Sequence, residues 1–164
     1  MTYDAKIDRL PIFALFDLKG PQEALSKWAK DTPAFPKGPN TLTHKASATL
    51  CHIGPRRWLL RDDLENEATW SASLNPEEAP ADISIVRVSD TQTFFRITGP
   101  DASEVMSIGC TLDLHPAVFA DDAVSYTEFF GCKALVLRCE HGFDCAVEQS
   151  FGNMIKDFLN RATA

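Results

Sequence analysis

Cysteine and histidine side chains gather late in the chain, where their spacing raises the question of a metal site. Cys139, His141 and Cys145 surround one expected hairpin turn, and Cys132 lies in the turn before it. Structural zinc needs four such ligands, and Cys-x-His-x3-Cys is not a common zinc spacing. Alternation along the two strands instead predicts Cys139 and Cys145 as buried thiols. The sequence therefore predicts no metal site.

Candidates for acid–base chemistry are few. Asp113 stands two residues before His115, so its carboxylate could orient that imidazole. Asp101 opens an expected helix, where its negative charge suits the positive end of the helix dipole. A polar exit from that helix explains Asp113 and His115 without chemistry, and no serine, cysteine or histidine has a recognisable catalytic spacing. The sequence predicts no catalytic residue.

Two glycine–proline turns, Gly54-Pro55 and Gly99-Pro100, are poor phosphate-binding loops. A phosphate nest needs donating backbone N–H groups, and proline has none. Pro100 instead fits the first position of a helix. The chain is therefore expected to bind no nucleotide cofactor.

The segment GPRRWLL and a pair of phenylalanines are the candidates for a contact with a partner. Trp58, beside two leucines in an expected strand, is typical of a core aromatic. Either neighbouring arginine could present its guanidinium fork to a partner's carboxylate. Adjacent strand residues point to opposite faces, so two neighbouring phenylalanines require helices or another subunit on both faces of their sheet. The candidate interface comprises Arg56, Arg57, Trp58, Phe129 and Phe130.

Apolar periodicity and turn residues predict an α+β fold of two related halves with mostly antiparallel sheets covered by helices. The first half has the split β-α-β order, strand, helix, strand, strand, helix, strand. Its expected strands are 12–18, 46–53, 57–61 and 83–88, its helices 21–30 and 62–74, and its longest loop 32–43. The second half has expected strands 93–97, 124–130, 134–139 and 143–147, and helices 100–108 and 151–159. No internal sequence repeat is strong enough to prove a duplication.

Length and charge define the broad class of protein. We expect residues 1–9, which are polar, to be a flexible N-terminus, and residues 10–164 to form one domain with halves 10–89 and 90–164. The net charge of −7 disfavours binding to nucleic acid or to an anionic membrane surface.

The compartment is also an expectation from composition. No apolar run approaches the roughly 20 residues of a membrane helix. The first ten residues carry charges where a signal peptide needs its apolar stretch. Five cysteines without a repeating pattern fit reduced thiols, so we expect a cytoplasmic protein.

Three of these motifs together carry a family resemblance. The run VRVSDTQTFFRITGPDASEVMSIGCTLDLHPAVF, the segment VEQSFGNMIKDFLNR near the C-terminus and GPRRWLL before the second helix resemble the gamma subunit of heterotetrameric sarcosine oxidase. The match covers about residues 46–161. That family is similar to folate-binding domains of the aminomethyltransferase type, which implies split β-α-β halves.

The resemblance implies a non-catalytic structural subunit of a flavoprotein complex. Such a complex oxidatively demethylates sarcosine to glycine and passes the one-carbon unit to tetrahydrofolate. Its implied partners are large subunits, which hold FAD, FMN, NAD and tetrahydrofolate, and a small zinc subunit. The resemblance implies no cofactor and no catalytic residue in this chain, so none is transferred.

Two alternatives remain at this stage. The first is a stand-alone tetrahydrofolate-binding protein for one-carbon transfer, of the aminomethyltransferase type, whose polar residues would be Asp101, Asp113 and His115. A stand-alone aminomethyltransferase is roughly twice as long as this chain, which disfavours it. The second is a small binding or regulatory module of another amine-oxidising enzyme.

Overall fold

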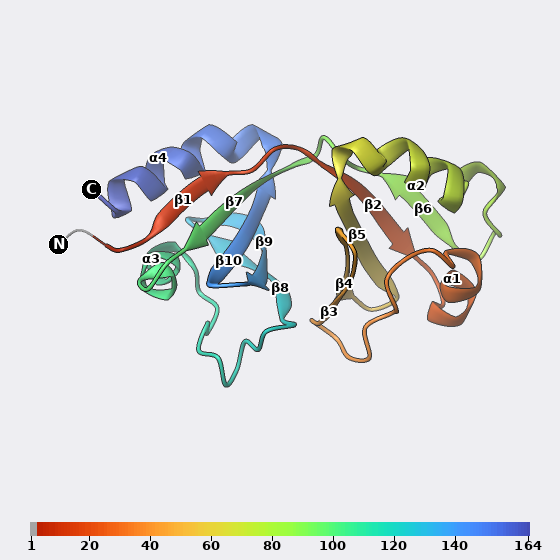
Figure 1. Cartoon of the computed structure of the whole chain (residues 1–164), viewed down its shortest axis with the longest axis horizontal. Helices are drawn as coiled ribbons and strands as arrows, with labels where there is room; N and C mark the ends of the chain where they lie inside the picture. The colour runs from red at the N-terminus through yellow and green to blue at the C-terminus, as the bar shows by residue number, and fades with distance from the viewer. Residues whose placement is uncertain (1–2) are drawn as a thin grey trace. The chain divides into compact units, whose positions relative to one another are not determined.

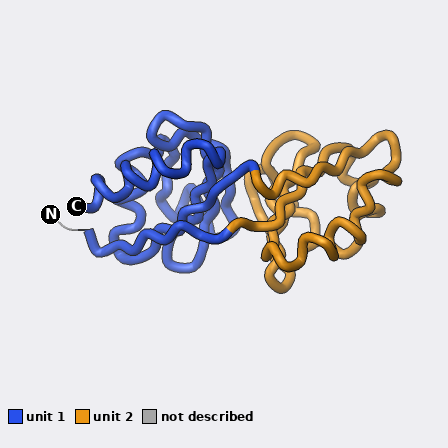
Figure 2. The backbone as a smooth tube through the Cα atoms, turned by 90° about the horizontal axis from the view of Figure 1, so that it is seen from above, with its two compact units in different colours: residues 1–11, 91–164 blue, residues 12–90 orange. Residues whose placement is uncertain are grey.

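The computed structural model describes residues 3–164, which form two compact units (Figure 2). Unit 2 is Ile12–Asp90, and unit 1 joins the N-terminal residues up to Pro11 to Thr91–Ala164. The chain therefore passes from one unit to the other twice. The expected halves, 10–89 and 90–164, left the N-terminal segment out of the second half, because the strand with which it pairs lies far along the sequence.

Unit 2 is a five-stranded antiparallel sheet in the order β3-β4-β5-β2-β6 (Figure 1). Its main elements are β2 (Phe13–Lys19), α1 (Gln22–Trp28), β3 (Leu42–Lys45), β4 (Ala48–Gly54), β5 (Arg57–Asp63), η1 (Leu64–Asn66), α2 (Glu67–Leu74), η2 (Pro76–Glu78) and β6 (Ser84–Arg87). Without β3, this is the expected split β-α-β order, in which the first strand lies between the third and the last. β3 begins within the segment expected to be a loop, so it adds an edge strand that the sequence did not predict.

Unit 1 is a second antiparallel sheet, in the order β1-β7-β10-β9-β8. Its elements are β1 (Lys6–Arg9), β7 (Gln92–Thr98), α3 (Ala102–Gly109), β8 (Val124–Phe129), β9 (Cys132–Cys139), β10 (Gly142–Glu148), η3 (Gln149–Phe151) and α4 (Gly152–Ala162). Together the two sheets and their helices confirm the expected α+β fold class. None of the described helices is long and apolar enough to cross a membrane.

The N-terminal segment is an ordered strand where it was expected to be flexible. β1 runs beside β7 (Figure 1), with Ile7 opposite Ile97. The Arg9 guanidinium donates from Nε to Thr93 Oγ1 (3.0 Å) and from Nη1 to Asn153 Oδ1 (2.9 Å). The expectation for 1–9 is therefore wrong for Lys6–Arg9, because the free edge of β7 orders a polar segment; residues 1–2 lie outside the described residues.

The two units share one plan, although no sequence repeat was evident. β2 pairs with β5 so that Lys19 faces Arg57, and β7 pairs with β10 so that Thr98 faces Gly142. Arg57 and Gly142 each begin a seven-residue strand, which is followed by a three-residue 3-10 turn and a helix. In unit 1 the last strand of the plan is β1, supplied by the other end of the chain.

A glycine closes the corresponding turn in each unit. Gly20 and Gly99 have φ values of 141° and 118°. The Gly20 N–H donates to the Arg56 carbonyl (3.0 Å), and the Gly99 N–H donates to the His141 carbonyl (3.1 Å). Arg56 and His141 are themselves left-handed turn residues. This repeated device supports a structural duplication within the chain.

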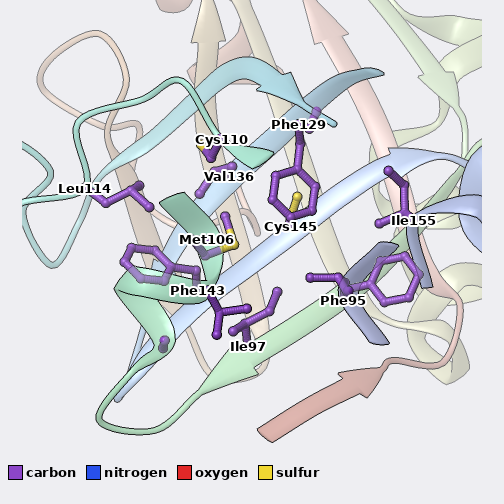
Figure 3. Close-up of a cluster of buried hydrophobic side chains, with 14 of the residues drawn as sticks. Phe95, Ile97, Met106, Cys110, Leu114, Phe129, Val136, Phe143, Cys145 and Ile155 are labelled. Carbon is purple, nitrogen blue, oxygen red and sulfur yellow. The ribbon is translucent and has the colours of Figure 1, made fainter. Parts of the chain in front are cut away.

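Each unit has its own hydrophobic core between one face of its sheet and its two helices. In unit 1, Figure 3 shows Met106 of α3 and Ile155 of α4 with Phe143 of β10. Both helices contribute because their apolar residues recur at three- and four-residue spacing. The opposite face of the sheet is also buried, as Phe94 and Leu135 are each 1% exposed.

Candidate functional site

Corresponding turns of the two units border two cavities. In unit 1 a cavity of about 490 Å³ lies between the Gly99-Pro100 turn and the β9–β10 hairpin. In unit 2 a cavity of about 400 Å³ lies between Gly20 and the β4–β5 turn that carries Arg56. These cavities collect several of the residues singled out in the sequence, so their chemistry is the first test of those expectations.

The guanidinium of Arg138 at the unit 1 cavity is already hydrogen-bonded within the chain. Arg138 lines the cavity, but its Nη2 donates to the carbonyls of Leu114 (2.9 Å) and Phe119 (2.7 Å). Its guanidinium also lies 4.5 Å from the centroid of the Phe143 ring. Arg138 therefore fastens the loop after α3 to the sheet.

The cysteines near this cavity do not converge with other ligands. Cys139 and His141 line the cavity, whereas Cys145 is fully buried in β10. Burial raises the pKa of the Cys145 thiol, which keeps it neutral. Within residues 3–164, no three His, Cys, Asp or Glu side chains are grouped so that they could hold a metal ion.

Asp101, Asp113 and His115 have local structural partners. Asp113 Oδ1 accepts the backbone N–H of His115 (2.9 Å), and His115 Nδ1 accepts the backbone N–H of Ala117 (3.2 Å). These bonds shape the loop after α3 rather than orient the imidazole with the carboxylate. Asp101 Oδ2 accepts the backbone N–H of Asp4 (2.7 Å), which ties the start of the chain to α3.

The two arginines of GPRRWLL differ in what they offer to a partner. Arg57 donates from Nε (2.9 Å) and Nη2 (3.0 Å) to the two carboxylate oxygens of Asp17, and Lys19 Nζ lies 3.2 Å from the same carboxylate. The fork of Arg57 is thus occupied within the chain. Arg56 is exposed at the turn, in the left-handed conformation (φ 54°). The structure leaves Arg56 as the more accessible guanidinium.

The aromatic candidates lie largely inside their units. Trp58 is 2% exposed and stacks on His52, with the ring centroids 5.0 Å apart, and Phe129 is fully buried. Phe130 is not a strand residue, because it occupies the turn between β8 and β9 with φ 47°. Its ring therefore does not oppose that of Phe129; the two centroids are 4.6 Å apart.

A buried carboxylate in unit 2 escaped the sequence analysis, which took Asp62 as the start of a helix. Asp62 ends up 5% exposed in β5. Its oxygens accept the Trp70 indole N–H (2.7 Å), the Asn66 amide (3.1 Å), the backbone N–H of Asp63 (2.8 Å) and the Ser47 hydroxyl. Only the pairing of β5 with its neighbours determines that this side chain faces inward.

Loss of the Trp70 bond is expected to destabilise unit 2. Trp70→Phe removes one donor from a buried carboxylate, which costs about 1–3 kcal/mol. Trp58→Phe is the matched control, because the buried Trp58 indole N–H has no hydrogen-bond partner among the described residues. Urea unfolding followed by circular dichroism should show the larger loss for Trp70→Phe. Equal losses would mean that ring volume, not the hydrogen bond, dominates.

The stability that Asp62 supplies should depend on pH. Burial alone would raise the pKa of Asp62, but the hydrogen bonds from Ser47, Trp70, Asp63 and Asn66 outweigh it and lower the pKa. A carboxylate with a lowered folded-state pKa stabilises the fold above its unfolded-state pKa of about 4 and loses that contribution below it. Asp62→Asn should therefore cost most at neutral pH, and its deficit should shrink in unfolding curves recorded below about pH 4. A deficit independent of pH would contradict this.

The fold defines a class: a duplicated α+β protein built from two split β-α-β units. Among solved structures, it is similar to heterotetrameric sarcosine oxidase from Corynebacterium sp. U-96 in complex with pyrrole 2-carboxylate, with a TM-score of 0.82 and 19% sequence identity over 97% of this chain and 83% of that chain. It is also similar to the glycine cleavage system aminomethyltransferase T from Bartonella henselae, with a TM-score of 0.71 and 15% identity over 96% of this chain.

These similarities confirm the expected aminomethyltransferase-type fold, and they bear out the resemblance to sarcosine oxidase at the level of the fold. The chain corresponds to only 46% of the aminomethyltransferase chain. No protein-family model and no curated protein matches the sequence.

Proposed function

We propose that this chain is a non-catalytic structural subunit of a heterotetrameric sarcosine oxidase-like flavoprotein complex. The observation that carries the proposal is the agreement of its fold, over 97% of its length, with a chain of heterotetrameric sarcosine oxidase. The complex would demethylate sarcosine oxidatively to glycine and pass the one-carbon unit to tetrahydrofolate. Its partners would be large subunits with FAD, FMN, NAD and tetrahydrofolate, and a small zinc subunit.

The bonding of the polar residues supports a structural role. Asp113, His115 and Arg138 hold the loop after α3 through main-chain groups. Arg57 is held by Asp17. Side chains that already satisfy one another within a chain are suited to hold its shape, and are less suited to transfer protons to a substrate.

The direct test is co-expression of the tagged chain with the flavoprotein and zinc subunits of a heterotetrameric sarcosine oxidase in the cytoplasm of a bacterial host. We expect a stoichiometric complex with a flavin absorbance spectrum and sarcosine oxidation. If the chain purifies alone as a colourless monomer while the other subunits assemble without it, the proposal is wrong.

Within this proposal, Arg56 is the interface residue that we carry forward. Its exposed guanidinium beside the unit 2 cavity can bond a partner's carboxylate. Arg56→Glu should weaken retention of the other subunits during purification, whereas Arg161→Glu, the same charge change at an exposed position of α4, should not. Equal retention by both variants would remove Arg56 from the interface.

The similarity to aminomethyltransferase T favours a second candidate, a stand-alone tetrahydrofolate-binding protein for one-carbon transfer. Titration of the purified chain with tetrahydrofolate, followed by tryptophan fluorescence, tests it. Saturable binding to the isolated chain would support this candidate over the structural subunit. A flat titration would leave the subunit role as the better account.

A further inference from the structure

A third cavity, of about 310 Å³, lies in unit 2 between the β3–β4 turn and α2. The turn contributes Ala46 and Ser47, and α2 contributes Trp70 and Ser73. Asp62 of β5 and Asp31, which follows α1, also line it. The volume is at the lower end of the range for small-molecule sites, so it fits one compact group.

The corresponding place in unit 1 is filled by aromatic rings. Ser73 is the seventh residue of α2, and Phe158 is the seventh residue of α4. The turns of the corresponding hairpins carry Ala46 (φ 52°) in unit 2 and Phe130 (φ 47°) in unit 1. Phe130 and Phe158 stack with their ring centroids 5.2 Å apart. The same plan thus has an aromatic plug in one unit and small residues around a cavity in the other.

The charges that line this third cavity determine which ligand it can bind. The four groups that hydrogen-bond to the Asp62 carboxylate are all neutral, so its buried negative charge keeps an attraction for a cation. Asp31 adds a second carboxylate, whose Oδ2 accepts the Ser73 hydroxyl (2.5 Å). Lys45, the one cationic residue among the described residues of the lining, donates to the Asp31 carbonyl (2.9 Å). Two carboxylates and one ammonium leave the lining negative, and Trp70 supplies an apolar wall.

We propose that this cavity binds a compact organic cation, an alkylammonium or alkylguanidinium group. The cationic head would lie toward Asp62 and Asp31, and the alkyl part would pack on the Trp70 and Ala46 side. Such a group would restore in unit 2 the packing that Phe130 and Phe158 provide in unit 1. The inference rests on the cavity and its charges, not on the proposed function.

The test is titration of the ¹⁵N-labelled full chain with n-butylammonium and, separately, n-butylguanidinium, followed by NMR of the indole N–H signals. The Trp70 signal should shift with saturation, with a Kd of about 1 mM or tighter, because small ligands reach such affinities only in a fitted site. The Trp28 indole, which donates to the Leu74 carbonyl (2.6 Å), is the internal control and should shift little. Neutral n-butanol and anionic butyrate should bind at least tenfold more weakly.

A plugged variant separates binding from general salt effects. Ala46→Phe combined with Ser73→Phe places phenylalanine, the residue at both corresponding positions of unit 1, at two positions that are exposed in unit 2. The chain should remain folded, and the Trp70 shift should be lost. Asp31→Asn, at the rim of the cavity, should weaken the binding of both cations but not the binding of butanol. The proposal is overturned if neither cation gives a saturable Trp70 shift, if butanol binds as tightly, or if the plugged variant binds like the wild type.

The cation could be a free amine or a basic side chain of another subunit, and the same probe distinguishes them. If the occupant is a free amine, n-butylammonium should also bind to the assembled complex, as measured by calorimetry. If a partner's lysine or arginine fills the cavity, assembly should abolish binding of the free amine while the isolated chain retains it. Failure of the complex to assemble would contradict only the proposed function, because the isolated chain still tests the cavity.

Discussion

Arg96→Leu is expected to destabilise unit 1 by about 3 kcal/mol. Arg96 donates from Nε (2.7 Å) and Nη2 (2.8 Å) to both oxygens of Asp144, whose side chain is fully buried. These bonds raise the pKa of Arg96, so the guanidinium stays charged. The substitution leaves a buried carboxylate without the cation that binds both its oxygens, and this costs more than losing a surface ion pair. We place the loss at the lower end of the known range because 40% of the Arg96 side chain is exposed.

The matching substitution in unit 2 provides the control. Arg57→Leu removes a similar fork from Asp17, but Lys19 remains 3.2 Å from that carboxylate. Its cost should be only about 1 kcal/mol. Urea unfolding should be followed by circular dichroism, because all three tryptophans lie in unit 2 and do not report on unit 1.

Two further observations would identify the cause of the Arg96→Leu effect. The loss should diminish at acidic pH, where protonation removes the buried charge. The double variant Arg96→Leu, Asp144→Leu should recover much of the stability, since apolar residues often replace a buried ion pair without loss. No recovery in the double variant would mean that packing, rather than the unpaired charge, accounts for the loss.

Gly142→Ala should be the most disruptive glycine substitution in unit 1, with a loss of about 3 kcal/mol or more. Gly142 opens β10 and pairs with Thr98 of β7. A Cβ at this position would collide with the Ile97 carbonyl oxygen and would lie 2.9 Å from the Thr98 Cα. These are backbone atoms of the neighbouring strand, so a side chain cannot move aside to relieve the collision. The two strands would have to separate where β10 begins.

Gly38→Ala is the matched control for this prediction. An added Cβ at Gly38 meets no atom within 4 Å, and Gly38 is not among the glycines with positive φ. Its effect on the free energy of unfolding should be within about 0.5 kcal/mol of zero. Comparable midpoints for the two alanine variants would show that the β7–β10 pair accommodates a side chain at position 142.

Local patterns in the sequence were sufficient to predict most elements. The strands around Phe16, Leu60 and Phe95 were expected because β-rich apolar segments lie between glycine and proline turns. The helix after Pro100 was expected from its apolar spacing and its proline start. The split β-α-β order of unit 2 followed directly from the order of these elements.

The β8–β9 turn and two of the edge strands, β1 and β3, were predicted less well. The turn between β8 and β9 falls at Phe130 and Gly131, so β8 ends one residue earlier than the expected strand 124–130. A phenylalanine with a left-handed backbone conformation is uncommon. The ring of Phe130 stacks on Phe158, so the contact that compensates for this conformation comes from a residue far along the chain.

By itself the sequence determined the class of fold, the order of most elements, the buried thiol of Cys145 and the motifs that resemble sarcosine oxidase, because these depend on neighbouring residues and their periodicity; the same expectation was wrong for Cys139, which is only partly buried. Only the tertiary structure decided that β1 completes unit 1, that Arg57 is held by Asp17 and Arg96 by Asp144, and that unit 2 keeps a charged cavity. The physical reason is distance along the chain. The partners of the two ion pairs are 40 and 48 residues apart, and no local pattern records which side chains strand pairing will bring together.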